Sequence, residues 1–150
     1  MQLVFIKGAG KYDRLDVLLD GACISSVPCP KQGIIPHDML HFAVEVTLQR
    51  RGFITRTREG DVSGFRMTPT AESDGIERLV EVFQADGWAG WRSEPSELLD
   101  LYRVTCEARC CTPLSIGEPE MLAVRGRIQQ LTADWQVVAI GGTMRLSWDI

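Results

Sequence analysis

This sequence has no long apolar run, few histidines and no surplus of positive charge. Each of these features argues against a class of protein. No apolar run approaches the roughly 20 residues that a helix needs to cross a bilayer, so we expect no membrane partner. Lys and Arg number 16 against 20 Asp and Glu, a net charge of −4, which argues against a nucleic-acid partner. Only two histidines are present, so any catalytic triad would need His37 or His41 as its base.

Signatures of disulfide-bonded and zinc-ribbon proteins are missing as well. The five cysteines form an odd number, and no pair has the Cys-x-x-Cys spacing of a zinc ribbon or a redox motif. The first residues contain only a short apolar run with no small-residue cleavage site after it, which is not the pattern of a secretion signal. Together these absences predict reduced thiols and a cytoplasmic location.

What the sequence does contain is typical of a globular protein. Its 150 residues are 45% hydrophobic and 24% charged, values that predict a single domain spanning residues 1–150. A domain of this length buries a core without metal or disulfide support. We see no internal repeat, low-complexity stretch or linker that would divide the chain.

Hydrophobic periodicity predicts an α+β fold, in which a small, mostly antiparallel sheet packs against about four helices. The N-terminal segments and the last segment have strand patterns, so we expect the C-terminal strand to return to the N-terminal sheet. The apolar stripes between them repeat at helical spacing. The expected strands are 3–7, one or two within 14–27, 53–58 as a short edge strand, and 143–148; the expected helices are 36–49, 74–85, 95–110 and 118–135.

Two of the expected helices begin with local signals. Pro36 suits the first position of a helix, where its missing N–H needs no partner. Asp38 then falls in the first turn, where the helix dipole stabilises a carboxylate. Asp74 and Glu77, three residues apart, form a variant of the capping box at the start of the second helix.

The first helix carries both histidines on its one polar face. On a helical wheel five polar residues form one face that only Leu48 interrupts: His37, Asp38, His41, Glu45 and Gln49. The remaining arc is apolar and wide, which predicts that the helix is heavily buried. Because a polar face on such a helix must reach water or find partners, this is where the sequence places a candidate site.

Three interpretations of this face remain open. In the first, the face is solvated or pairs internally, for instance His41 with Glu45. In the second, His37 and His41 bind zinc or a similar divalent metal, and Asp38, Glu45 or a residue elsewhere completes the shell; we assign Glu45 to this role. In the third, the segment is an Asp version of the His-Glu-x-x-His helix of metalloproteases, whose acidic residue activates a metal-bound water.

The segment "GIIPHDMLHFAVEVTLQRRGF" resembles one found in a family of small, uncharacterised bacterial proteins, roughly Leu-Pro-His-Asp-Leu-x-His-Phe/Tyr-x-Val-Glu followed by Gly-Phe. The closing strand with its late Trp148 is similar too. The resemblance implies a common architecture and carries no mechanism, since no activity is assigned to that family. The matching positions are Pro36, His37, Asp38, His41, Phe42, Val44, Glu45, Gly52 and Phe53.

A cluster of four arginines follows the first helix and suggests a second kind of contact. Guanidinium groups bind phosphate or carboxylate ligands, so we assign Arg56 and Arg58, together with Asp38, to ligand binding. The alternative is a solvated face on which Glu59 and Asp61 offset the arginines.

These patterns favour a non-catalytic module that binds a ligand, a metal or a partner through the polar face of the helix at 36–49, with homo-oligomerisation left open. The alternative is a small metal-dependent hydrolase centred on His37-Asp38-x-x-His41. We prefer the binding module because a hydrolase should carry a further metal ligand and a base, and neither stands out in the sequence.

The charge balance gives a first testable prediction. At physiological salt the protein should not shift a duplex or single-stranded oligonucleotide in a gel titration, because it lacks the Lys and Arg surplus that phosphate binding requires. Tight binding that weakens steeply as salt is raised would contradict this.

Overall fold

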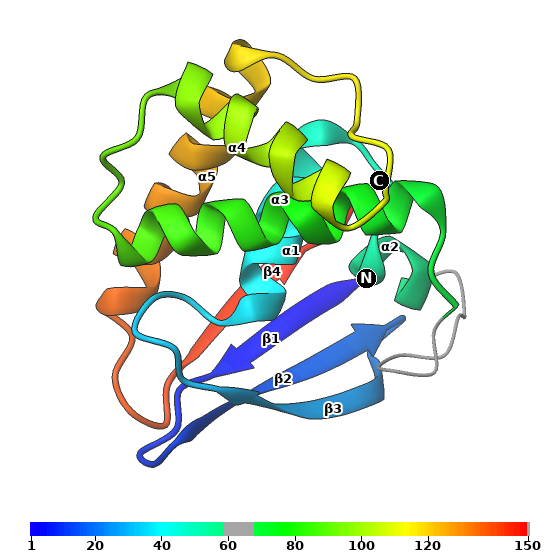
Figure 1. Ribbon diagram of the computed structural model, residues 1–150. Coiled ribbons are helices and arrows are strands. Elements are labelled where there is room, and N and C mark those ends of the chain that lie inside the picture. Colours follow the sequence, from blue (N-terminus) through cyan, green and yellow to red (C-terminus); the bar gives the residue numbers. More distant parts are fainter. Residues whose placement is uncertain (59–67, 150) are drawn as a thin grey trace.

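The structure is a four-stranded antiparallel sheet with helices packed against one face (Figure 1). It is a computed structural model that describes residues 1–58 and 68–149. The expected α+β class is confirmed, with five helices in the described part of the chain where about four were expected. The elements are β1 (Gln2–Ile6), β2 (Tyr12–Leu19), β3 (Ala22–Pro30), α1 (His37–Leu48), α2 (Phe53–Arg58), α3 (Ala71–Trp88), α4 (Pro95–Ala108), α5 (Glu118–Gln136) and β4 (Thr143–Ser147).

The C-terminal strand pairs with the N-terminal strand, as the sequence predicts. The strand order is β3-β2-β1-β4, and every pair is antiparallel. Leu3 of β1 lies opposite Val17 of β2 and opposite Leu146 of β4. Residues directly opposite each other share one face of a sheet, and all three belong to the buried core. This register turns the apolar face of the sheet toward the helices.

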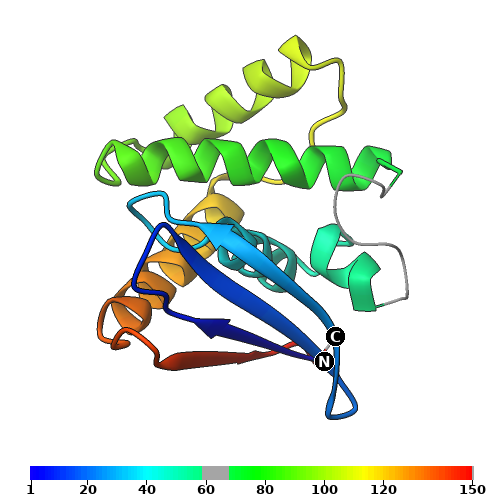
Figure 2. The same cartoon turned by 90° about the horizontal axis from the view of Figure 1, so that it is seen from below.

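The helices are stacked in layers on that face. Figure 2 shows α1 and α5 next to the sheet, α3 beyond them, and α4 outermost. α1 contacts both α3 and α5, and α4 packs against the same two helices. The apolar arc of α1 is buried as expected, which leaves its polar residues to find partners on α2 and α3.

The start of α3 differs from the expectation in a way that matters for the site. The helix begins at Ala71, because the Thr70 hydroxyl accepts from Ser73 N and the Ser73 hydroxyl accepts from Thr70 N. The capping box is therefore Thr70 and Ser73, and not Asp74 and Glu77. Glu77 lies inside the helix, where its side chain faces α1.

Two further expectations concern the helices and the cysteines. No helix in the described ranges is long and apolar enough to cross a membrane. All five cysteines are unpaired, in keeping with the predicted free thiols.

The segment 53–58 was expected to be an edge strand, and this expectation is wrong: it forms α2. The cause is the buried carboxylate of Glu45 on α1. Glu45 Oε1 accepts from the backbone N–H groups of Gly52 at 2.9 Å and Thr55 at 3.0 Å, and Oε2 accepts from that of Ile54 at 3.1 Å. These N–H groups have no partner within a helix, and an anion beside them also favours the helix dipole.

Gly52 makes this approach possible. A Cβ atom at position 52 would lie 2.5 Å from Glu45 Cδ, so any other residue would push the carboxylate away. The alternating pattern of 53–58 is thus overruled by a contact with α1 that local sequence does not reveal.

Replacing Glu45 should test this arrangement. Glu45→Ala leaves the backbone N–H groups at the start of α2 buried without an acceptor and should lower the free energy of unfolding by about 3 kcal/mol. Glu107→Ala, at an exposed position on α4, should change it by less than about 0.5 kcal/mol. Urea denaturation of both variants measures the difference, and equal effects would contradict the assigned role of Glu45.

Candidate metal centre

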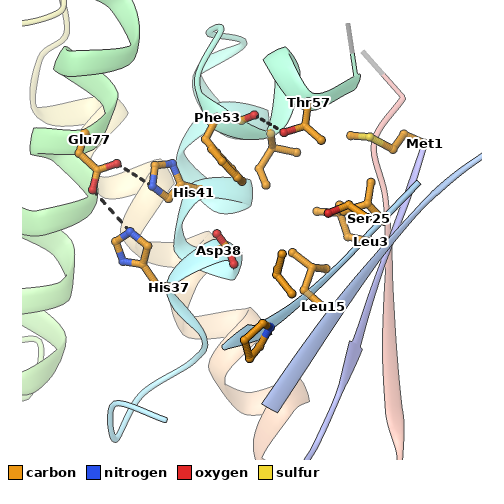
Figure 3. Close-up of a pocket in the computed structure, with 14 residues that line it drawn as sticks. Met1, Leu3, Leu15, Ser25, His37, Asp38, His41, Phe53, Thr57 and Glu77 are labelled. Atoms are coloured by element: carbon orange, nitrogen blue, oxygen red, sulfur yellow. Dashed lines mark hydrogen bonds and ion pairs between the residues drawn. The ribbon is translucent and has the colours of Figure 1, made fainter. Parts of the chain in front are cut away.

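α1 places its two histidines against one carboxylate of α3. His41 Nε2 lies 2.9 Å from Glu77 Oε2, and His37 Nε2 lies 3.5 Å from Glu77 Oε1 (Figure 3). The four-residue spacing places the rings side by side on one face of the helix, where they meet edge to face with centroids 4.9 Å apart. One ligand atom from each of the three residues falls within 4.8 Å of the others, which is a separation that one metal ion can bridge.

The second nitrogen of each imidazole also faces an acceptor. His37 Nδ1 lies 3.0 Å from Gln84 Oε1, two turns further along α3. His41 Nδ1 lies 3.5 Å from Glu45 Oε2, which is longer than an ordinary hydrogen bond, and this buried atom has no hydrogen-bond partner among the described residues. Metal-binding histidines typically donate the outer N–H to a carboxylate or carbonyl oxygen while the inner nitrogen faces the ion. Both imidazoles are turned this way, and His37 also makes the outer hydrogen bond.

The three groups differ in burial, but their interactions with neighbouring charged groups govern their charges. The side chain of His41 is 5% exposed, whereas those of Glu77 and His37 are 35% and 42% exposed. Burial alone would lower the pKa of His41, but its interactions with Glu45 and Glu77 outweigh this and raise it to about 10. Without a metal, the buried His41 is therefore an imidazolium between two carboxylates at neutral pH.

The other two members of the cluster respond to the same charges. Burial would raise the pKa of Glu77, but the hydrogen bonds and charges of the two histidines hold it well below its usual range. The pKa of His37 is raised, chiefly by its hydrogen bond to Glu77 and against the effect of burial. The cluster thus favours a cation at its centre, whether a proton or a metal ion.

A pocket of about 390 Å³ adjoins the cluster, between the sheet and helices α1 and α2. Such a volume lies within the usual range for small-molecule sites. His37, His41 and Glu77 form one end of it, and Figure 3 shows apolar side chains of the sheet, Leu3 and Leu15 among them, at the opposite end. The lining residues are Met1, Leu3, Leu15, Val17, Ser25, Val27, Pro28, His37, Asp38, His41, Phe53, Ile54, Thr57 and Glu77.

Asp38 lines this pocket on the side of α1 that faces the sheet. Its Oδ2 lies 3.6 Å from Cys29 Sγ, a buried thiol. Burial and the neighbouring carboxylates, Asp38 foremost, raise the pKa of Cys29 to about 12, so the thiol stays protonated and is not a nucleophile.

The predicted site residues are distributed over three environments. His37 and His41 share the cluster, while Glu45 lies behind His41 and accepts from the start of α2. Arg56 lines a smaller hollow of about 180 Å³ that shares His41 and Glu77 with the main pocket. Arg58 closes α2, and its side chain lies outside what the structure describes.

Sequence reasoning missed Glu77 and Gln84. The local sequence predicts a capping role for Glu77 and gives no role to Gln84. Their spacing of seven residues places both on one face of α3, beside its apolar stripe, and this was the available signal. Pairing that face with the polar face of α1 required knowing that the two helices are neighbours.

Comparison with known proteins identifies no relative: no family model, no curated protein and no solved structure is significantly similar to this chain.

The raised pKa of His41 predicts a pH dependence for the metal-free protein. Because the folded state holds this proton more tightly, the stabilisation from His41 is complete below its ordinary value of 6.5 and is lost as pH rises toward about 10. The pKa of Glu77 is lowered, so the stabilisation from Glu77 is present above its ordinary pKa of 4.5 and is lost in acid. EDTA keeps the protein free of metal. Under these conditions the difference in the free energy of unfolding between the parent and His41→Gln should shrink as pH rises from 6.5 to 10.

His37→Gln provides the comparison, because His37 is far more exposed and should contribute less at every pH. Urea denaturation at several pH values measures both differences. A difference for His41→Gln that stays constant up to pH 10 would contradict the assigned charge state.

Proposed function

We propose that this chain is a binding module that holds a divalent metal ion, zinc or one like it, at His37, His41 and Glu77. The observation that carries the proposal is the convergence of two Nε2 atoms on the Glu77 carboxylate while both Nδ1 atoms face outer acceptors. Imidazole nitrogen and carboxylate oxygen are ligands that suit zinc. Three protein ligands leave one tetrahedral position for water or a bound molecule, and the adjoining pocket gives that molecule room.

The charges around His41 also support this proposal. Two carboxylates, Glu45 and Glu77, flank a fully buried imidazole, an arrangement that is stable only with a cation between them. In the metal-free protein that cation is the second proton of His41. A divalent ion takes the place of that proton and brings one further positive charge, while His41 returns to the neutral form that ligates metals.

A second candidate is a small metal-dependent hydrolase centred on the same helix. The pocket and the third ligand, Glu77, favour it, and Asp38 follows His37 as the catalytic Glu follows the first His of the His-Glu-x-x-His motif. Binding comes first in our ranking, because hydrolysis also needs a base beside the open position. Asp38 is one methylene shorter than Glu and interacts with the Cys29 thiol.

We also propose that the protein works in the cytoplasm. The five unpaired cysteines support this, since exposed thiols such as Cys23 and Cys110 persist in a reducing compartment.

Zinc titration of the purified protein tests the metal site. The parent should bind one ion per chain, and Glu77→Gln should weaken binding by about 100-fold or more. The matched control is Glu81→Gln, one turn further along α3, where the carboxylate pairs with Arg78 and Arg109. Gln84→Ala removes only the outer acceptor of His37 and should weaken binding by about 10- to 100-fold.

Affinity should also fall as pH is lowered, because protons compete with the ion for the two imidazoles. Equal zinc affinities for Glu77→Gln and Glu81→Gln, or no stoichiometric binding by the parent, would refute the proposal.

A further inference from the structure

The pocket beside the cluster has walls that suit a hydrocarbon. Its apolar lining comes from both layers: Leu3, Leu15, Val17, Val27, Phe53 and Ile54. A volume of about 390 Å³ has room for on the order of a dozen water-sized groups, which corresponds to a small molecule. The Thr57 hydroxyl at its edge already donates to Phe53 O at 2.9 Å. Ser25 adds one hydroxyl to the sheet wall, so the body of a molecule in this space is largely apolar.

The charges at the polar end balance once an ion is bound. Glu77, as a ligand, and Asp38, in the wall of the same pocket, carry two negative charges that offset the two positive charges of the ion, while Glu45 is held by the backbone N–H groups of α2. Among the described residues that line the pocket there is no Lys or Arg to pair with a second anion, and the N-terminal ammonium of Met1 donates to Trp148 O at 3.3 Å. A cationic head group would be repelled by the ion. An anionic one would be attracted by the ion but repelled by Asp38, and it would add a charge that no Lys or Arg of the lining compensates. Both penalties are large in a partly buried site.

Asp38 adds a directional requirement. It is an acceptor in the pocket wall, and the Cys29 thiol 3.6 Å away is a weak donor. A molecule that covers Asp38 must donate a hydrogen to it, since a buried carboxylate without a good donor is costly. To occupy the open coordination position of the ion, the same molecule must also offer an atom with a lone pair.

From these requirements, and resting on the proposed metal function, we infer that the pocket binds an uncharged amphipathic amide. Its hydrocarbon body lies against the sheet residues Leu3 and Leu15. Its N–H donates to Asp38, and its carbonyl oxygen faces the ion. A primary carboxamide combines these donor and acceptor properties in one compact, neutral head group.

Three probes of equal chain length separate the alternatives: hexanamide, hexanoate and hexylamine. Each is titrated into the zinc-loaded protein, and binding is followed by the NMR signals of the Leu3 and Leu15 methyl groups and the Phe53 ring. Hexanamide should bind at least about tenfold more tightly than the two charged probes, because only it avoids burying an unbalanced charge. Equal or tighter binding of hexanoate or hexylamine would overturn the inference.

Asp38→Asn tests the residue that sets this preference. The variant should bind hexanamide about tenfold more weakly and should accept hexanoate better than the parent does, since the repelling charge is gone. A loss of structure alone would not produce this reversal of preference. Asp100→Asn, at an exposed position on α4, is the matched control and should leave all three affinities unchanged.

Zinc affinity is measured separately for the parent and for Asp38→Asn. Failure of the parent to bind zinc refutes the proposed function itself. Stoichiometric zinc binding without a preference for hexanamide refutes only the ligand class and leaves the metal site standing.

Discussion

The buried carboxylate of Glu45 is the interaction on which the rest of the site depends. It is fully buried on α1, yet it meets backbone donors of Gly52, Ile54 and Thr55 on one side and His41 on the other. An isolated carboxylate in such a place would cost several kcal/mol, so the chain after α1 must fold back and present its N–H groups. This fixes α2 as a helix and brings its side chains over the sheet, where they close one side of the pocket. The same carboxylate faces the outer nitrogen of His41, whose other nitrogen points at Glu77. One charged group thus couples the wall of the pocket to the orientation of a candidate ligand.

The polar cluster has features that distinguish it from an ordinary buried ion pair. In a buried polar network with a purely structural role, the donors and acceptors are generally all paired with one another inside the core. Here His37 and Glu77 remain 42% and 35% exposed, and the buried His41 Nδ1 lies too far from Glu45 for a good hydrogen bond. The cluster therefore runs from the core to the wall of a pocket. A site that must exchange an ion or a small molecule needs this combination of a rigid inner side and an accessible outer side.

Much of the fold could be predicted from the sequence, because it follows from local periodicity. The alternation in 143–148 and the apolar stripes of the four longer helices were sufficient to identify those elements. The exception, 53–58, has a strand-like alternation that the structure overrules, since Glu45 provides the acceptors that a helix start requires.

Glu77 was missed for a related reason. Its spacing from Asp74 matched a capping box, and the true box at Thr70 and Ser73 became visible only once the start of α3 was known. The helical wheel gave the direction in which His37 and His41 point, but not the helix they would meet.

The position of the pocket follows from the same layer geometry. α1 crosses the sheet with its apolar arc toward the core, so its polar face turns toward α3. Asp38, one position after His37, lies on the side of α1 between the apolar arc and the polar face. That flank meets the part of the sheet that α2 covers, and α2 is only six residues long. Apolar side chains of β1 and β2 consequently share a space with Asp38 and the histidines instead of being sealed beneath a longer helix. The pocket thus has a hydrophobic wall and a charged wall that face each other. Such a pair of walls complements an amphipathic molecule better than it complements water.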